Sequence, residues 1–219
     1  MSEKRQPIHR QIVAEQLKKA ELDEFLKREL EDSGFDHVEV ISSAVKERIL
    51  VFAERPGVVI GRHGRTSKRL AELISKRFSM ENPYVEAISV KNSYLSSRIV
   101  ANKIKRRILL GYNPRRVGYF TMRNVMDAGA LGVEIIISGK FGGERARSLR
   151  FRDGVMMKTG TTTTQYVSEA VEHVLLKQGM MGVKVRILLP EIRKPDELRI
   201  RENKAKELLK EQVRELAAS

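Results

Sequence analysis

The sequence predicts an α+β fold in two domains, followed by a charged tail. Apolar residues recur at helical spacing in some segments and at alternate positions, as in strands, in others. The turn-rich stretch Gly111-Tyr-Asn-Pro114 separates two such sets of elements. A chain of 219 residues with 41% hydrophobic residues is long enough for two ordinary domains. We expect a first domain at 1–92, a basic connecting helix at 93–114, an α+β domain at 115–192 and a helical or disordered tail at 193–219.

The N-terminal half predicts helix, strand, strand, short helix, turn, helix and strand. Apolar residues recur at helical spacing from Ile8 to Leu30, and Gly34 follows as a stop signal. Pro56 suits the first turn of a short helix that ends at Gly61, and Pro83 follows the end of the next helix. The expected bounds are 8–30, 38–42, 48–53, 56–60, 65–78 and 85–90.

The C-terminal half predicts two helices, a hairpin, a third helix and a last strand. Gly129 caps the second helix, and the hairpin turns at 140–143. The run Thr161 to Thr164 favours the N-cap of a third helix, whose apolar positions continue from Val167 to Leu175 and which Gly179 closes. The expected bounds are 94–110 and 115–128 for the helices, 132–139 and 146–157 for the hairpin, and 183–189 for the last strand. Beyond Arg193, alternating Glu and Lys are typical of an exposed helix or of a tail that orders on contact.

The charge of the chain predicts a polyanionic partner. The net charge is +14, and the pI is about 10.1. Residues 55–158 hold 22 Lys and Arg against 7 Asp and Glu, a net of +15, so the remainder is nearly balanced. The basic central segment is therefore where we expect the partner to bind.

Composition also excludes several kinds of site. The absence of cysteine excludes disulfides, thiolate zinc sites and cysteine nucleophiles. The four histidines show no ligand spacing, so we expect no metal and no other cofactor. The N-terminus has no apolar signal region, and no apolar run approaches membrane-spanning length. We therefore expect a cytoplasmic protein with no membrane association and no small-molecule substrate.

The turn Gly61-Arg62-His63-Gly64 is the most informative motif. A Gly-x-x-Gly turn that opens a helix and holds basic residues resembles the KH module, which holds single-stranded nucleic acid there. Glycine allows a positive φ and a close approach of the sugar-phosphate backbone, and the helix directs free N–H groups towards phosphate. Three further matches have simpler explanations: those at Gly129 and Gly179 as helix C-caps, and that at Gly139 as a hairpin turn. The order of the preceding elements is that of a KH domain with an N-terminal helix-strand extension.

Basic residues in four regions are candidates for RNA contact. Arg116 and Arg123 are seven apart and share a helix face. The pairs at 145 and 147 and at 150 and 152 each project to one face of a strand, which is costly unless anions lie against it. For each residue alone, a solvated surface charge is the alternative. With the loop itself, the candidates are Gly61, Arg62, His63, Gly64, Arg65, Lys68, Arg69, Lys103, Lys105, Arg106, Arg107, Arg115, Arg116, Arg123, Lys140, Arg145, Arg147, Arg150 and Arg152.

Three stretches together resemble one family. They are 56–64, 129–140 with its continuation through Arg145-Ala-Arg147, and 179–190. They are similar to the universal small-subunit ribosomal protein S-three family in its archaeal form, and the likeness runs in order from about Arg5 to Pro190. It is more specific than the loop alone, since NusA-type factors and Era-type GTPases carry similar KH modules without this second domain.

The resemblance implies a place in the head of the small ribosomal subunit, bound to ribosomal RNA (rRNA) and to neighbouring ribosomal proteins. It also implies a surface beside the channel where messenger RNA (mRNA) enters, at which basic residues grip and help unwind the message. The paired arginines of that surface match Arg115 and Arg116. A third basic residue of bacterial members falls at Tyr119, and Arg123, one turn further on, is the nearest substitute.

No motif predicts catalysis. The sequence has no P-loop, no Gly-x-Ser-x-Gly and no His-Glu-x-x-His. We therefore expect a non-enzymatic structural component of the small subunit. Two alternatives remain: a KH factor that binds RNA away from the ribosome, and a nucleic-acid lyase that uses a lysine Schiff base at abasic sites.

Overall fold

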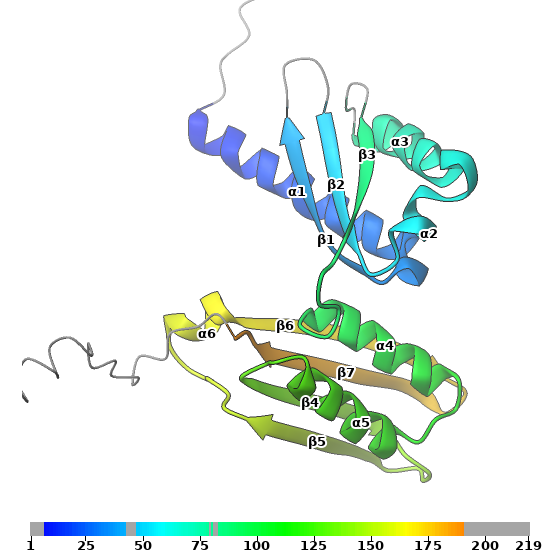
Figure 1. Ribbon diagram of the computed structural model, residues 1–219, viewed down its shortest axis with the longest axis vertical. Coiled ribbons are helices and arrows are strands. Elements are labelled where there is room, and N and C mark those ends of the chain that lie inside the picture. The colour runs from blue at the N-terminus through cyan, green and yellow to red at the C-terminus, as the bar shows by residue number, and fades with distance from the viewer. Residues whose placement is uncertain (1–6, 43–46, 79, 81–82, 191–219) are drawn as a thin grey trace, which may run out of the picture.

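The structure, a computed structural model, describes residues 7–42, 47–78, 80 and 83–190. It contains a three-stranded sheet of order β1-β2-β3 and a four-stranded sheet of order β5-β4-β7-β6. Figure 1 shows the two sheets as separate bodies, with α4 at the boundary between them. Two distinct apolar clusters form the cores beneath the two sheets. The α+β fold expected from the sequence is confirmed. The tail predicted at 193–219 lies outside the described residues.

The first domain builds its core from one face of each helix. Its elements are α1 (Ile8–Glu29), β1 (Phe35–Ser42), β2 (Glu47–Ala53), α2 (Pro56–Ile60), α3 (Arg65–Phe78) and β3 (Tyr84–Ser89), with one-turn helices η1 (Glu31–Ser33) and η2 (Arg62–Gly64). β2 pairs antiparallel with β1 and parallel with β3. Leu70, Ile74 and Phe78 are four apart on α3, so they share the face that packs on the sheet. The predicted elements of this half are confirmed.

The second domain has its helices on one face of an antiparallel sheet. Its elements are α4 (Ser97–Leu109), α5 (Pro114–Asp127), β4 (Gly132–Lys140), β5 (Ala146–Gly154), α6 (Thr161–Tyr166), β6 (Val167–Leu176) and β7 (Gly179–Leu188). Val133, Ile135 and Ile137 of β4 alternate towards α4 and α5, which contribute Ile104 and Val125 to the same core. The basic helix at α4 therefore packs on the second sheet.

One predicted helix is wrong. We expected a helix from Thr161 to Gly179, but only α6 is helical, and β6 follows it. β6 pairs with β7 from Val167 opposite Leu188 to Leu176 opposite Gly179. Gly179 therefore begins a strand after a tight turn and caps no helix. The other predicted cap is confirmed, because Gly129 follows α5 with φ 93° and donates its N–H to the Met126 carbonyl at 2.9 Å.

The contact between the two domains is polar. Arg98 of α4 donates to the Asp23 carboxylate at 2.7 Å and to the Asp36 carbonyl at 2.8 Å. Lys27 of α1 pairs with Glu172 of β6 at 2.6 Å. These contacts hold the α4 face of the second domain against α1 and the start of β1. Among the described residues, no helix combines the length and the apolar character needed to cross a membrane.

Candidate nucleic-acid interface

The loop between α2 and α3 has the backbone that the motif predicts. Gly61 has φ 70° and Gly64 φ 71°, and His63 between them also has a positive φ of 54°. A Cβ at Gly61 would lie 2.1 Å from the Thr66 Oγ1, so only glycine fits there. The chain closes with the Gly64 N–H donating to the Gly61 carbonyl at 3.3 Å, and the Ser67 hydroxyl donating to the Gly64 carbonyl at 3.2 Å.

The basic residues of this loop face solvent. Arg62, His63 and Arg65 are exposed, as are Lys68 and Arg69 on the first turns of α3. Val59 of α2, together with the buried face of α3, anchors the loop from below. Exposed cations at the start of a 14-residue helix meet the electrostatic requirement for holding a phosphate. Contact with RNA at these residues stays a prediction.

The basic cluster of α4 has acidic partners in the first domain. Lys103 pairs with Glu54 at 2.7 Å. Lys105 pairs with Glu31 at 2.5 Å and lies 3.6 Å from Glu172. Burial opposes the charge of Lys105, but its bond to Glu31 and the nearby Glu172 outweigh burial and raise its pKa above the ordinary value.

The remaining two residues of the cluster are also engaged. Arg106 donates to the Glu31 carbonyl at 2.5 Å and lies 3.4 Å from the Asp32 carboxylate. The Arg107 guanidinium lies 4.7 Å from the centre of the Phe120 ring. Lys103, Lys105 and Arg106 thus have a structural role between the domains, which the sequence did not reveal. RNA contact by this cluster stays a prediction.

The start of α5 presents two arginines towards different neighbours. Asn113 caps the helix by accepting the Arg115 N–H at 3.0 Å, and Pro114 occupies its first turn. Arg115 lines a hollow of about 240 Å³ with Arg147 of β5. Arg116 lines a separate apolar hollow of about 360 Å³ beside Phe120. Arg115 and Arg147 thus line one hollow, and Arg116 lines another.

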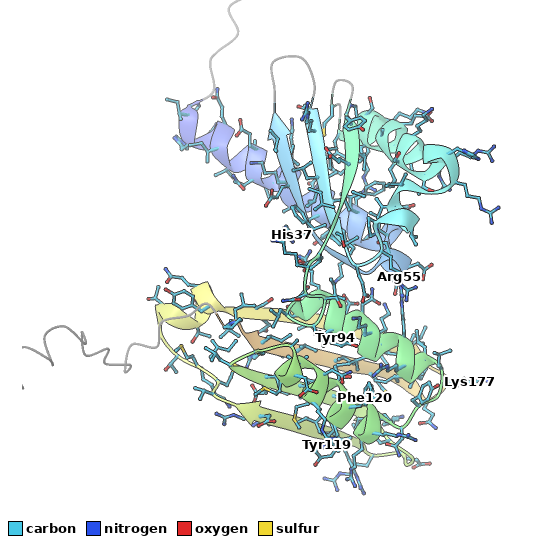
Figure 2. The ribbon with its side chains drawn as sticks, in the orientation of Figure 1. His37, Arg55, Tyr94, Tyr119, Phe120 and Lys177 are labelled. Atoms are coloured by element: carbon cyan, nitrogen blue, oxygen red, sulfur yellow. The ribbon has the colours of Figure 1, made fainter. Side chains whose placement is uncertain are left out.

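Two aromatic residues follow these arginines on α5. Tyr119 and Phe120 both project from α5 (Figure 2). The Tyr119 ring lies edge-on to the Phe151 ring with 5.0 Å between ring centres, and the Arg107 guanidinium lies over the Phe120 ring. Arg123 is exposed one turn further along the helix. A basic side chain is thus available on α5 near Tyr119.

The arginines of β5 divide between the two faces of the sheet. Arg147 has the same strand parity as Leu149 and Phe151, which pack beneath the helices. Arg150 and Arg152 have the opposite parity and project from the face without α4 and α5. On that face Glu134 of β4 lies beside Arg150, with 3.6 Å between the Glu134 Oε1 and the Arg150 Nε, and RNA contact by these arginines stays a prediction. Lys140 and Arg145 are exposed at the two ends of the β4–β5 turn.

Glu134 is the residue that sequence reasoning missed. Its side chain is 1% exposed although no α4 or α5 residue covers this face. Burial opposes its charge, but Lys158, Arg186 and Arg150 outweigh burial and hold its pKa below the usual range. Lys184 and Arg186, two apart on β7, also pair with Glu169 of β6. In the sequence, the spacing of Lys184 and Arg186, two apart and thus on one face of a strand, could have indicated a charged face on this sheet.

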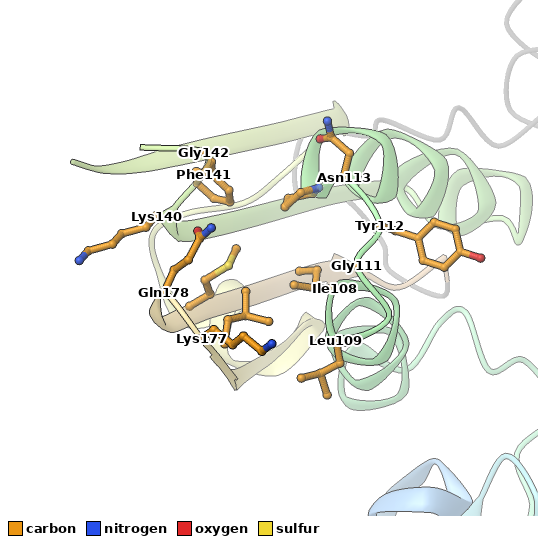
Figure 3. A pocket seen from close by; sticks show the side chains of 13 residues that line it. Ile108, Leu109, Gly111, Tyr112, Asn113, Lys140, Phe141, Gly142, Lys177 and Gln178 are labelled. Carbon is orange, nitrogen blue, oxygen red and sulfur yellow. The ribbon is translucent and has the colours of Figure 1, made fainter. Parts of the chain in front are cut away.

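A larger hollow lies at one end of the second sheet. It has a volume of about 680 Å³ and lies between the α4–α5 connection, the β4–β5 tip and the β6–β7 turn (Figure 3). Its lining is apolar at Ile108, Phe141 and Met181, with Lys140 and Lys177 at its edge. No cluster of acidic residues or histidines among the described residues is suited to a metal ion.

The fold and the loop define a two-domain RNA-binding protein with an N-terminal KH domain. A family model for the KH domain matches residues 21–94, and one for the C-terminal domain of ribosomal protein S3 matches residues 100–187. Curated relatives have the name small ribosomal subunit protein uS3. That of Methanothermobacter thermautotrophicus is 40% identical over 86% of this chain and 73% of its own length. That of Methanocaldococcus jannaschii is 38% identical over 90% of this chain and 94% of its own length. That of Methanococcus maripaludis is 38% identical over 92% of this chain and 95% of its own length. The chain belongs to the ribosomal protein S3 (uS3) family, a family of ribosomal proteins and not of enzymes.

Proposed function

We propose that this protein is a structural component of the small ribosomal subunit that binds rRNA in the subunit head. The exposed Gly61 to Gly64 loop is the observation that carries the proposal. Its two glycines and His63 all have positive φ, so the backbone is shaped for close approach by a phosphate chain. Membership of the uS3 family favours this hypothesis over an RNA-binding factor that acts off the ribosome and over a lyase.

Sedimentation tests the placement in the subunit. The protein should migrate with small subunits at moderate salt, and failure to do so would refute the ribosomal hypothesis. Borohydride trapping on abasic DNA should give no covalent adduct, because the proposed function needs no Schiff base.

Charge reversal in the loop tests the phosphate contact. Changing Arg62 and His63 to Asp should weaken RNA binding and flatten its dependence on salt, because each lost phosphate contact lowers the slope of log K against log salt by about 0.7–0.9. A matched control changes Lys18 and Gln16 of α1 to Asp, which alters the net charge by the same amount at exposed positions. The loop has no phosphate contact if both variants change the slope equally.

We also propose that the start of α5 lies beside the channel where mRNA enters. Arg115 and Arg116 are exposed there, Arg147 lines the same hollow as Arg115, and Arg123 is exposed one turn beyond Tyr119, where it would supply a further basic side chain. Changing both arginines of the pair to Ala should slow initiation on structured messages more than it impairs subunit assembly. A defect in assembly alone would identify the pair as an rRNA contact.

A further inference from the structure

The face of the second sheet opposite α4 and α5 holds an ordered array of charges. The strand register aligns Arg152, Glu134, Arg186 and Glu169 in one row across β5, β4, β7 and β6. The next row contains Arg150, Ile136, Lys184 and Val171. Lys158 reaches Glu134 from the segment after β5, with 3.4 Å between its Nζ and the Glu134 Oε1. We call these five cations and two carboxylates the sheet-face cluster.

Glu134 lies at the centre of the sheet-face cluster. Its Oε1 accepts from Lys158 and approaches Arg150, while its Oε2 lies 3.3 Å from the Arg186 Nη1. A single buried carboxylate thus fixes three cations that come from two strands and a loop. Without it, Arg150 and Lys158 would repel each other and spread into solvent, whereas Arg186 would still pair with Glu169.

The cations around Glu134 are partly exposed to solvent, although Glu134 itself is buried. The side chains of Arg150 and Lys158 are 62% and 45% exposed, against 1% for Glu134. The seven charged groups have a formal net of +3, with the negative charge of Glu134 beneath and the positive charges above. Adjacent strands are about 4.8 Å apart, so the backbones of β5 and β7 are separated by roughly 10 Å, and the side chains of Arg150 and Arg186 converge from them on Glu134.

The chemistry of this face selects its ligand. Among the residues that the four described strands place on this face, only His173 on β6 has an aromatic ring on which an unpaired base could stack, and Ser138, Ser148 and Gly182 are small. The cores of protein–protein interfaces are depleted of charge, whereas charge is concentrated here in the centre of the sheet. Fixed guanidinium and ammonium groups on a flat surface instead suit the phosphates of an RNA duplex, which offers its backbone and not its bases.

We propose that the sheet-face cluster binds the phosphate backbone of double-stranded RNA, and that Glu134 is a positioning residue that holds its cations in place. This inference rests on the proposed RNA-binding function and assigns it a second surface, with duplex RNA as its ligand. The surface is separate from the Gly61 to Gly64 loop of the first domain, which is proposed to hold a single strand.

The test uses the sign of a charge change. Glu134→Gln removes one negative charge and so raises the net charge by one, and simple attraction would therefore tighten binding to any RNA. Because Glu134 organises the cations, we expect the opposite: duplex binding weaker by roughly three- to tenfold and a smaller salt slope. The probes are an RNA duplex of about 16 base pairs and one of its strands alone, titrated with the full chain. Glu144→Gln removes the same charge from an exposed position of the β4–β5 turn and should leave duplex binding unchanged or tighter.

Each outcome decides the proposal. Weaker duplex binding with single-strand binding within about twofold of the original supports it. Duplex binding by Glu134→Gln that is unchanged or tighter overturns it, as does an equal loss on both probes. Loss of co-sedimentation with small subunits, with duplex binding intact, would overturn it in favour of a protein partner. If the original chain binds neither probe, the proposed RNA-binding function itself fails.

A second variant keeps the test independent of folding. If Glu134→Gln lowers the midpoint of thermal unfolding below the assay temperature, the double variant Arg150→Gln with Lys158→Gln replaces it, because both side chains end in solvent. That variant should lower the salt slope for the duplex by up to about 1.8, from two lost phosphate contacts, and an unchanged slope would overturn the proposal.

Discussion

Gly118 of α5 allows a quantitative test of how the second domain is packed. A Cβ at this position would lie 2.3 Å from the nearest carbon of the Phe151 ring, and the next two ring carbons would be at 2.6 and 2.7 Å. Ordinary contact begins at 3.4 Å, so Gly118→Ala requires α5 and β5 to separate by about 1 Å or the ring to rotate away.

Two opposing effects set the result. Alanine in a helix interior is favoured over glycine by about 1 kcal/mol. Overpacking against a buried ring costs about 1–3 kcal/mol. The contact distance places Gly118→Ala near the upper end of that range, so we expect a net destabilisation of about 1–2 kcal/mol. For a domain of roughly 100 residues, this lowers the midpoint of thermal unfolding by about 4–15 °C.

Gly57 of α2 is the matched control. It is also helical, but a Cβ there would meet nothing within 4 Å. Gly57→Ala should therefore keep only the helical gain and raise stability by up to about 0.5–1 kcal/mol. Scanning calorimetry of both variants gives the comparison, and Phe151→Leu should partly rescue Gly118→Ala. If Gly118→Ala is as stabilising as Gly57→Ala, the packing argument is refuted.

Two further results are expected. Gly61→Ala should destabilise the first domain and weaken RNA binding more than Gly64→Ala does. Both glycines have a positive φ, but only a Cβ at Gly61 would meet Thr66. Thermal unfolding measures the effect on stability, and an RNA titration measures the effect on binding. Burial opposes the charge of Glu54, but Lys103 outweighs burial and holds the pKa of Glu54 below its ordinary value. The stability from this pair is therefore fully present above the ordinary glutamate pKa and is lost as pH falls through the lowered pKa. Urea unfolding between neutral and acid pH should show a shallower loss of stability in acid for Glu54→Gln, and an identical loss would contradict the pairing.

The first domain was predictable because its signals are local. Pro56 and Gly61 mark the two ends of α2, and the four-residue spacing of Leu70, Ile74 and Phe78 marks the buried face of α3. Each signal involves residues within one or two turns of each other, so no distant partner was needed to interpret it.

The β6 segment was mistaken because its pattern fits both periods. Ala170 and Val174 are buried and four apart, which suits a helix face, but an even spacing also places them on one face of a strand. Three valines, which are β-branched and favour strands, were the contrary signal. Pairing with β7 decided the outcome, and that partner begins after the segment ends.

The charged contacts of α4 were hidden for a different reason. In the sequence, Lys103, Lys105 and Arg106 look like free positive charge in the basic central segment. Their carboxylate partners Glu31 and Glu54 lie about 50 to 75 residues earlier, in the part that appears electrically balanced. Charge counted along the chain therefore overstates the charge available to RNA at α4.

The polar boundary between the domains also bears on how the chain is made. Synthesis delivers the N-terminal domain first, and residues 22–85 already contain its whole apolar core. The surface that later contacts α4 carries Asp23, Glu31 and Glu54, whose carboxylates stay hydrated until α4 has been synthesised. The face of the nascent first domain that later meets α4 is thus polar, and the second domain can fold afterwards and dock on it through contacts such as those of Arg98 with the Asp23 carboxylate and the Asp36 carbonyl.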